Sequence, residues 1–296
     1  MNIVIPEPIT DAVVTANDLV NIESDWVAGT YSLGDRAVYG RKVYEVVADP
    51  DTADRPDLGA VADPPTWVEL GYSNRWRMFT EGTDSVSTAE GEINATLEFN
   101  KIINTVAVLG VQGASVTLTM TDPIEGLVYD QTIELIDIGV GDWWEYFFLP
   151  YDSNDAVVFH PPPYMEGVID VTVTATGIDD PVEAGRIVAG ISRELGVTLY
   201  GSSVDLQEYS IKDRDGFGNL TLVQRRTIKS VNYDVLVDTV KADLVIKQLS
   251  RLSGVPALYI GDPAITSTVT FGVFSDVSQG INDINTSELT LRVEEF

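Results

Sequence analysis

Residues 93–121 read INATLEFNKIINTVAVLGVQGASVTLTMT, and this stretch decides the fold class. It contains three runs, 93–99, 105–111 and 115–121, that are rich in Val, Ile and Thr and that alternate apolar with polar residues. A period of two is typical of strands with one buried face, and β-branched residues favour extended backbone. Asn and Gly separate the runs and suit turns. The stretch therefore predicts consecutive antiparallel strands.

The same pattern continues further along the chain, in residues 127–135 and 168–176. Short strands of this kind, separated by Gly, Asn, Asp or Pro, are typical of β-sandwiches and jelly rolls. We therefore expect residues 73–180 to form an antiparallel β-sandwich.

One segment of this domain, DWWEYFFLP at residues 142–150, carries too many aromatic side chains for both of its faces to meet solvent. We interpret it as a strand that a neighbouring element or another subunit covers. Its residues Trp143, Trp144 and Phe147 are candidates for an assembly interface.

Residues 181–296 change character and predict an α+β domain. The sequence DRDGFGN at 213–219 stands between two apolar runs, and its glycines suit a long hairpin turn. Phe217, inside that turn, is a fourth candidate for the assembly interface.

The C-terminal domain also contains the one convincing helix signal. Asp238 can cap the start, while Gly254 and Pro256 mark the end. The apolar residues expected on one broad face are Val240, Leu244, Val245, Leu249 and Leu252.

At the other end of the chain, residues 1–24 are expected to form an extended arm with a strand near 12–15. Residues 25–72 form a small module that relies on aromatic side chains for its core, because so short a segment has little other apolar area. Its acidic loop, 49–63, shows no helical periodicity. The aromatic anchors of the module are Trp26, Tyr31, Tyr44 and Trp67.

The charge of the chain excludes one class of partner. Its 296 residues have a net charge of −28, with 25 acidic and 7 basic side chains in residues 1–150 and 21 and 11 in residues 151–296. Nucleic acid is bound mainly by basic side chains that neutralise phosphate, so we expect no nucleic-acid binding. A surface of this sign suits a basic protein neighbour instead.

Catalytic motifs are few. The chain has no cysteine and one histidine, His160, which the neighbouring prolines place in a loop. Asp142 and Glu145 flank two tryptophans as in glycosidases, but residues three apart on a strand point to opposite faces. Asp213 opens a calcium-like loop that has Gln224 where the acidic ligand belongs. We expect no enzyme, no cofactor and no metal site.

Two further expectations concern location. No apolar run approaches the roughly 18 residues of a membrane-spanning helix, so we expect no membrane insertion. The first eight residues, MNIVIPEP, lack the features of a signal peptide. We therefore expect synthesis and folding in a cytoplasm.

The aromatic module resembles the small carbohydrate-binding modules of chitinases over about 50 residues. In those modules exposed aromatic residues bind chitin, so the resemblance implies that Trp26, Tyr31, Tyr44 and Trp67 are candidate sugar-binding residues. Two interpretations stay open, a purely structural core and a core that also presents a stacking platform. The matching residues are Trp26, Gly29, Tyr31, Gly34, Asp35, Val38, Tyr39, Gly40, Tyr44 and Glu45.

Five further segments are SNRWRMF (73–79), LGVTLYG (195–201), EYSIK (208–212), FGN (217–219) and PALYIGD (256–262). Through these segments most of the chain resembles structural tail proteins of tailed bacteriophages. This resemblance implies a virion tail component of the collar, baseplate or fibre-attachment type, made in the host cytoplasm and assembled with other tail proteins as a homo-oligomeric ring. The alternative is a protein that binds host-surface polysaccharide through the aromatic module.

Overall fold

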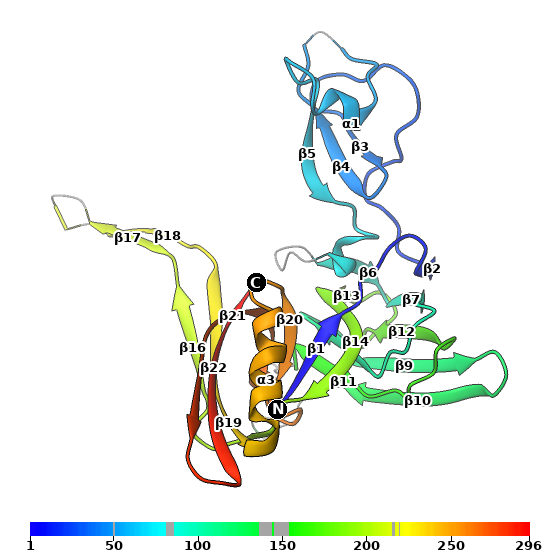
Figure 1. Cartoon of the computed structure of the whole chain (residues 1–296). Helices are drawn as coiled ribbons and strands as arrows, with labels where there is room; N and C mark the ends of the chain where they lie inside the picture. Colours follow the sequence, from blue (N-terminus) through cyan, green and yellow to red (C-terminus); the bar gives the residue numbers. More distant parts are fainter. Residues whose placement is uncertain (50, 81–85, 136–143, 145–153, 215–216, 219) are drawn as a thin grey trace. The chain divides into compact units, whose positions relative to one another are not determined.

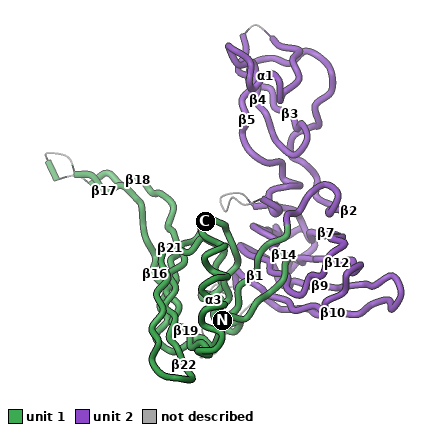
Figure 2. The backbone as a smooth tube through the Cα atoms, viewed as in Figure 1, with its two compact units in different colours: residues 1–7, 189–296 green, residues 8–188 purple. Residues whose placement is uncertain are grey.

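The structure is a computed structural model that describes residues 1–49, 51–80, 86–135, 144, 154–214, 217–218 and 220–296. It is mainly β, and among these residues one helix is longer than a single turn (Figure 1). Contacts divide the chain into two compact units, which Figure 2 colours separately: unit 1 is Met1–Glu7 with Ala189–Phe296, and unit 2 is Pro8–Val188. The predicted fold class, a mainly β chain with an aromatic module, a sandwich and an α+β part, is confirmed.

Unit 1 is built on an antiparallel sheet to which both ends of the chain contribute. The strands are β1 (Asn2–Pro6), β14 (Arg186–Glu194), β15 (Val197–Thr198), β16 (Ser203–Glu208), β19 (Thr227–Asp238), β20 (Ala257–Ile260), β21 (Val269–Ile281) and β22 (Thr286–Glu295). Their order is β14-β1-β20-β21-β22-β19-β15, and β16 also pairs with β19. A short 3₁₀ helix, η2 (Thr266–Thr268), precedes β21.

The first residues of the chain lie inside this sheet. In β1, Asn2 is opposite Glu194 of β14 on one side and Ile260 of β20 on the other. Ile3 is almost fully buried, and the backbone N–H of Glu7 donates to the carbonyl oxygen of Ala189 at 2.9 Å. The sequence indicated only an extended arm here; the pairing with β14 and β20 depends on residues about 190 and 260 positions away in the chain.

Helix α3 (Thr239–Arg251) covers one face of the unit 1 sheet. As predicted, the carboxylate of Asp238 caps it, accepting the Val240 N–H at 3.0 Å. The left-handed Gly254 follows two residues after the C-cap Leu252. The core that the helix and the sheet share contains Ala242, Val245, Leu249 and Leu252 from the helix side and Val231, Tyr233, Val235, Leu289, Leu291 and Val293 from β19 and β22.

The predicted apolar face of α3 was partly wrong. Val240 and Leu244 are 87% and 56% exposed, whereas Ala242, which the prediction omitted, is buried. Five apolar residues cover too wide an arc for a helix that rests on a sheet with one side only. The sheet buries a narrower apolar face of the helix, which includes Ala242, Val245 and Leu249, while Val240 and Leu244 remain in solvent.

Unit 2 contains the β-sandwich that the alternating runs predicted. Its main sheet has the order β10-β9-β12-β7-β2, and β7, β9 and β12 are buried at every second residue. Unit 2 also contains the antiparallel pairs β8–β11 and β6–β13, which belong to two other sheets; β8 is buried at four successive positions, so it has protein on both faces. The strands are β2 (Val14–Asn17), β6 (Ser87–Glu90), β7 (Glu92–Glu98), β8 (Thr105–Leu109), β9 (Ser115–Asp122), β10 (Gly126–Glu134), β11 (Ala156–Phe159), β12 (Val168–Thr174) and β13 (Pro181–Ala184).

Replacing Leu249 by Ala should destabilise unit 1 by about 2–5 kcal/mol, since the side chain is 1% exposed and its loss leaves a cavity under the sheet. Leu244→Ala on the same helix is the matched control and should change stability by less than about 0.5 kcal/mol. All five tryptophans lie in unit 2, so their fluorescence does not report on α3. Hydrogen exchange of the α3 amides is the measurement, and equal protection in both variants contradicts the prediction.

Candidate functional site

The aromatic module is a three-stranded antiparallel sheet with one turn of helix. Strands β3 (Arg36–Tyr39) and β4 (Lys42–Val46) form a hairpin whose turn contains the left-handed Gly40, and β5 (Trp67–Tyr72) pairs with β4. The single turn α1 (Pro56–Gly59) lies in the acidic loop, where the sequence predicted no helix. Pro56 at the first helical position makes that turn favourable without any apolar periodicity.

Two of the four predicted sugar-binding residues form the interior of the module. Trp67 is fully buried and its indole N–H donates to the Asp54 carbonyl oxygen at 3.0 Å. Tyr44 is 6% exposed and belongs to the same cluster. Gly59 makes room for the indole, since a Cβ there would lie 2.4 Å from Trp67 Cδ1. Neither ring presents a face to a ligand.

The other two, Trp26 and Tyr31, pack against this cluster and are half-buried. The Tyr31 ring meets Trp67 at 5.3 Å with an interplanar angle of 63°, and Trp26 meets Tyr39 at 5.6 Å and 89°. The Tyr31 hydroxyl donates to the Val27 carbonyl oxygen at 2.9 Å. The structure thus brings all four residues into one cluster, to which the edge-to-face contacts Tyr31–Trp67 and Trp26–Tyr39 contribute.

The segment after the module, Ser73–Phe79, is anchored by side chains that the sequence analysis did not single out. Asn74 is 3% exposed; its amide nitrogen donates to the carbonyl oxygens of Val20 and Thr88 at 3.0 and 2.8 Å, and its amide oxygen accepts the Thr88 N–H. Met78, at the centre of the short 3₁₀ helix η1 (Arg77–Phe79), is fully buried. These contacts hold the segment to Val20 and to Thr88 of β6.

Arg41 strengthens this connection electrostatically. Its guanidinium lies 4.2 Å from the centroid of the Trp76 ring and makes a bidentate ion pair with Asp11, with Nε at 3.1 Å from both carboxylate oxygens. The hydrogen bonds from Arg41 hold the pKa of the Asp11 carboxyl below its usual value. Module, junction and the segment before β2 thereby meet at one side chain.

The most exposed apolar element is a long hairpin that projects from unit 1 (Figure 1). We call it the arm, Ser203–Lys229: it runs from β16 through the two-stranded β17 (Ile211–Arg214) and β18 (Leu220–Val223) into the start of β19. The predicted hairpin turn is confirmed, and Phe217 lies in it with 95% of its surface exposed. The other apolar residues of the arm that are more than a third exposed are Val204, Leu206, Tyr209, Ile211, Leu220, Leu222 and Val223.

The aromatic segment of residues 142–150 is described at one position only. Trp143 and Phe147, and the carboxylates Asp142 and Glu145, lie outside the described residues. Trp144 is 60% exposed, and its backbone is helical where the sequence predicted a strand. A single residue does not define the surface that this segment forms.

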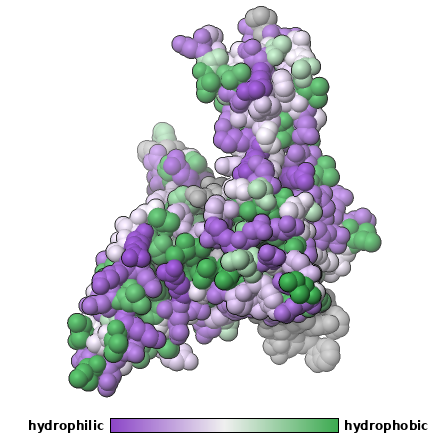
Figure 3. Space-filling view, turned by 45° about the vertical axis from the view of Figure 1, so that its right-hand side comes forward, coloured by the Kyte–Doolittle hydropathy of each residue, from purple (hydrophilic) through white to green (hydrophobic). Residues whose placement is uncertain are grey.

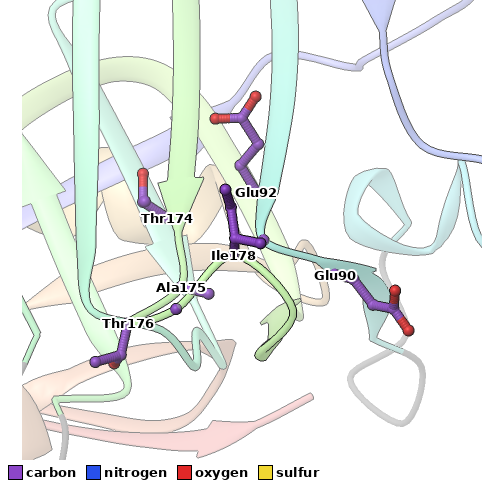
Figure 4. A pocket seen from close by; sticks show the side chains of 8 residues that line it. Glu90, Glu92, Thr174, Ala175, Thr176 and Ile178 are labelled. Atoms are coloured by element: carbon purple, nitrogen blue, oxygen red, sulfur yellow. The ribbon is translucent and has the colours of Figure 1, made fainter.

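A shallow hollow of about 430 Å³ lies in unit 2 between the β6–β7 turn and the end of β12 (Figure 4). Glu90 and Glu92 stand on either side of Gly91 and point in different directions, so they do not form a catalytic pair. The backbone here is satisfied, since Gly91 N–H donates to Asp180 and Ala175 N–H donates to Gly91. The hollow holds no arrangement for acid–base chemistry.

The metal-ligating and titratable side chains of the described residues do not gather into a site elsewhere. These contain no group of three or more His, Asp or Glu side chains placed to hold a metal ion. His160 follows β11 in a loop, as expected; its Nδ1 is 3.4 Å from the Thr105 hydroxyl, and burial lowers its pKa. No helix in the described part of the chain is long and apolar enough to cross a bilayer.

Comparison with known proteins adds no relative: no family model, no curated protein and no solved structure matches this chain. On the face drawn in Figure 3, apolar side chains lie among hydrophilic ones. The arm exposes many apolar side chains and the aromatic module groups its rings in one cluster. These two are therefore the candidate functional surfaces, and both are suited to binding.

Trp67→Ala should unfold the aromatic module, because it removes a fully buried side chain at a cost of about 3–5 kcal/mol and leaves the Asp54 carbonyl without its donor. Val68→Ala, on the same strand and 42% exposed before the change, should leave the module folded. Hydrogen exchange of the β3, β4 and β5 amides measures this. Unchanged protection in Trp67→Ala would show that the cluster is not the core.

Arg41→Gln should raise the pKa of Asp11 toward its ordinary value of 3.8, since the guanidinium hydrogen bonds are lost. The folded pKa is depressed, so the pair stabilises the protein above the unfolded pKa and loses that effect as the pH falls through the folded pKa. Carboxylate NMR titration reads this directly. Arg36→Gln is the control, because Arg36 pairs with Glu45 and should leave Asp11 unchanged; an equal shift in both variants contradicts the assignment.

Proposed function

We propose that this protein is a structural component of a bacteriophage tail, of the collar, baseplate or fibre-attachment type, and that it acts through protein–protein assembly. The sequence resemblance to tail proteins suggests the class. The arm is the observation that supports an assembly role. Ribbons of two strands are marginal in water by themselves, so an arm with this much exposed apolar surface requires a partner.

Two other features agree with this role. The described residues hold no metal cluster, and neither their hollow nor their lone histidine offers a catalytic arrangement. The junction after the module is anchored by the buried Asn74, which donates to the carbonyl oxygens of Val20 and Thr88.

The second candidate function is binding of host-surface polysaccharide by the aromatic module. It is favoured by Trp26 and Tyr31, whose half-buried rings keep part of their surface in solvent. Stacking on a sugar needs such a flat, partly exposed ring, and Trp67 and Tyr44 do not offer one. The area that remains exposed is small beside that of the arm, so we rank this function second.

The assembly role predicts that the chain is found in purified phage particles in a fixed copy number. Quantitative mass spectrometry of particles produced by the genome that encodes the chain is the measurement. Deleting the coding sequence should give particles with incomplete tails, and supplying the chain in trans should restore them. Absence of the chain from intact particles would overturn the proposal.

A glycan titration separates the two candidates. The assembly protein should show no change in tryptophan fluorescence with chitin oligosaccharides or with bacterial surface polysaccharide. Saturable binding that Trp26→Ala abolishes, with hydrogen-exchange protection of the module retained, would instead favour the polysaccharide-binding protein.

A further inference from the structure

The end of the arm is a two-stranded ribbon in which every described strand residue is exposed. Its register pairs Ile211 with Val223, Lys212 with Leu222, Asp213 with Thr221 and Arg214 with Leu220. Two strands of four residues bury too little surface to be stable alone. Their conformation therefore depends on something that covers one of the two faces.

The two faces of the ribbon differ in charge. Residues directly opposite each other in an antiparallel pair point to the same side, and the side alternates along the strand. One face thus carries Lys212, Arg214, Leu220 and Leu222, which combine two cations with two leucines. The other face carries Ile211, Asp213, Thr221 and Val223. The first face is suited to a surface that is both apolar and acidic.

Among the described residues, the partners that the structure shows for the two cations of this face are local ones in the arm itself. The Lys212 ammonium is 2.8 Å from a carboxylate oxygen of Glu208, and both side chains are more than half exposed. The Arg214 guanidinium donates to the Gly218 carbonyl oxygen at 3.4 Å. Exposed pairs of this kind contribute little to stability, so exchanging them for an intermolecular pair costs little.

The outer part of the arm, residues 209–229, is basic although the chain to which it belongs is acidic; the whole arm, which also includes Asp205 and Glu208, has a net charge of +1. Residues 209–229 contain five basic side chains (Lys212, Arg214, Arg225, Arg226 and Lys229) and two acidic ones (Asp213 and Asp215), a net charge of +3. The rest of the chain then has a net charge of −31. A second copy of this chain is thus a partner whose surface complements the ribbon in sign.

We infer that the arm of one copy binds the acidic surface of a second copy, with the face of Leu220, Leu222 and Arg214 buried in the contact. This inference rests on the proposed assembly function and names its first partner. The contact joins two different surfaces, so each copy both gives and receives an arm. Such head-to-tail contacts close into a ring when the rotation between copies permits it.

The ribbon is also suited to the kinetics of assembly. Complementary charges steer encounter and determine orientation, whereas the buried apolar side chains supply most of the affinity. The contact should therefore weaken with salt, since exposed charges are screened over about 10 Å at 0.1 M ionic strength. Other acidic proteins have the same charge complementarity to the ribbon. A measurement on this chain alone distinguishes a second copy from such partners.

Light scattering of the full-length chain over a range of concentrations tests the inference. The wild type should have a mass above that of the 32.2 kDa monomer and should dissociate at lower concentrations when salt is added. The double variant Leu220→Asp with Leu222→Asp should weaken self-association at least tenfold. Arg225→Glu should weaken it in the same direction, as its side chain is exposed and its charge adds to the positive arm.

A matched control uses another hairpin of the same unit. Ile281→Asp with Ile284→Asp changes two residues that are 74% and 87% exposed at the β21–β22 turn, and should leave the mass unchanged. Hydrogen exchange of α3 verifies that each variant is folded. A monomeric wild type, or equal masses for wild type and arm variant, would overturn the inference. Equal loss in the control would overturn it as well, because the effect would not be specific to the arm.

The outcome for the proposed function is separate. A wild type that is monomeric in solution but present in intact particles ends the second-copy inference and leaves the tail role, with a different acidic partner for the arm. The opposite outcome is a chain that forms arm-dependent oligomers in solution but is absent from phage particles. In that case the contact between copies is retained and the tail assignment fails.

Discussion

The structure depends on covering one apolar face of each antiparallel sheet. In unit 1 the cover is α3, whose 13 residues span about 20 Å, whereas the 12 residues of β19 span about 40 Å. Burial follows this mismatch: β19 is buried at alternate residues from Val231 to Val237 and exposed at Thr227. Where the helix no longer covers the strands, they continue as the arm, with their apolar residues still present.

This difference in length between α3 and β19 explains why the apolar side chains of the arm are exposed. A sheet that continues past its cover keeps backbone pairing but loses burial, so it needs a surface from outside the unit. The charge distribution agrees with the inferred self-contact, since the ribbon carries basic side chains and the chain as a whole is strongly acidic. Local sheet length and global charge are the two observations on which the proposed assembly role rests.

The aromatic module also has to cover one apolar face of its sheet, with fewer residues. It has only three strands and one helical turn, so Trp67 and Tyr44 fill its interior and Tyr31 and Trp26 close its sides. The buried rings of Trp67 and Tyr44 present no face to a ligand, whereas Tyr31 and Trp26 are half-buried. The resemblance to sugar-binding modules then concerns the frame that holds the rings, while the contact of Arg41 with Trp76 and Asp11 ties that frame to the junction.

The sequence by itself determined the strands, the hairpin at residues 213–219 and the cap of α3, because alternation, turn residues and capping are local. It also indicated Phe217 as a residue of the hairpin turn and the aromatic residues as a cluster. It did not predict that Asn74 anchors the junction, that a helical turn begins at Pro56, or that Val240 and Leu244 are exposed. Only the tertiary structure decided that β1 lies between β14 and β20, and that Trp67 is interior while Leu220 and Leu222 are not. These outcomes depend on which distant segment covers each face, and alternation within a strand is the same whether or not that cover is present.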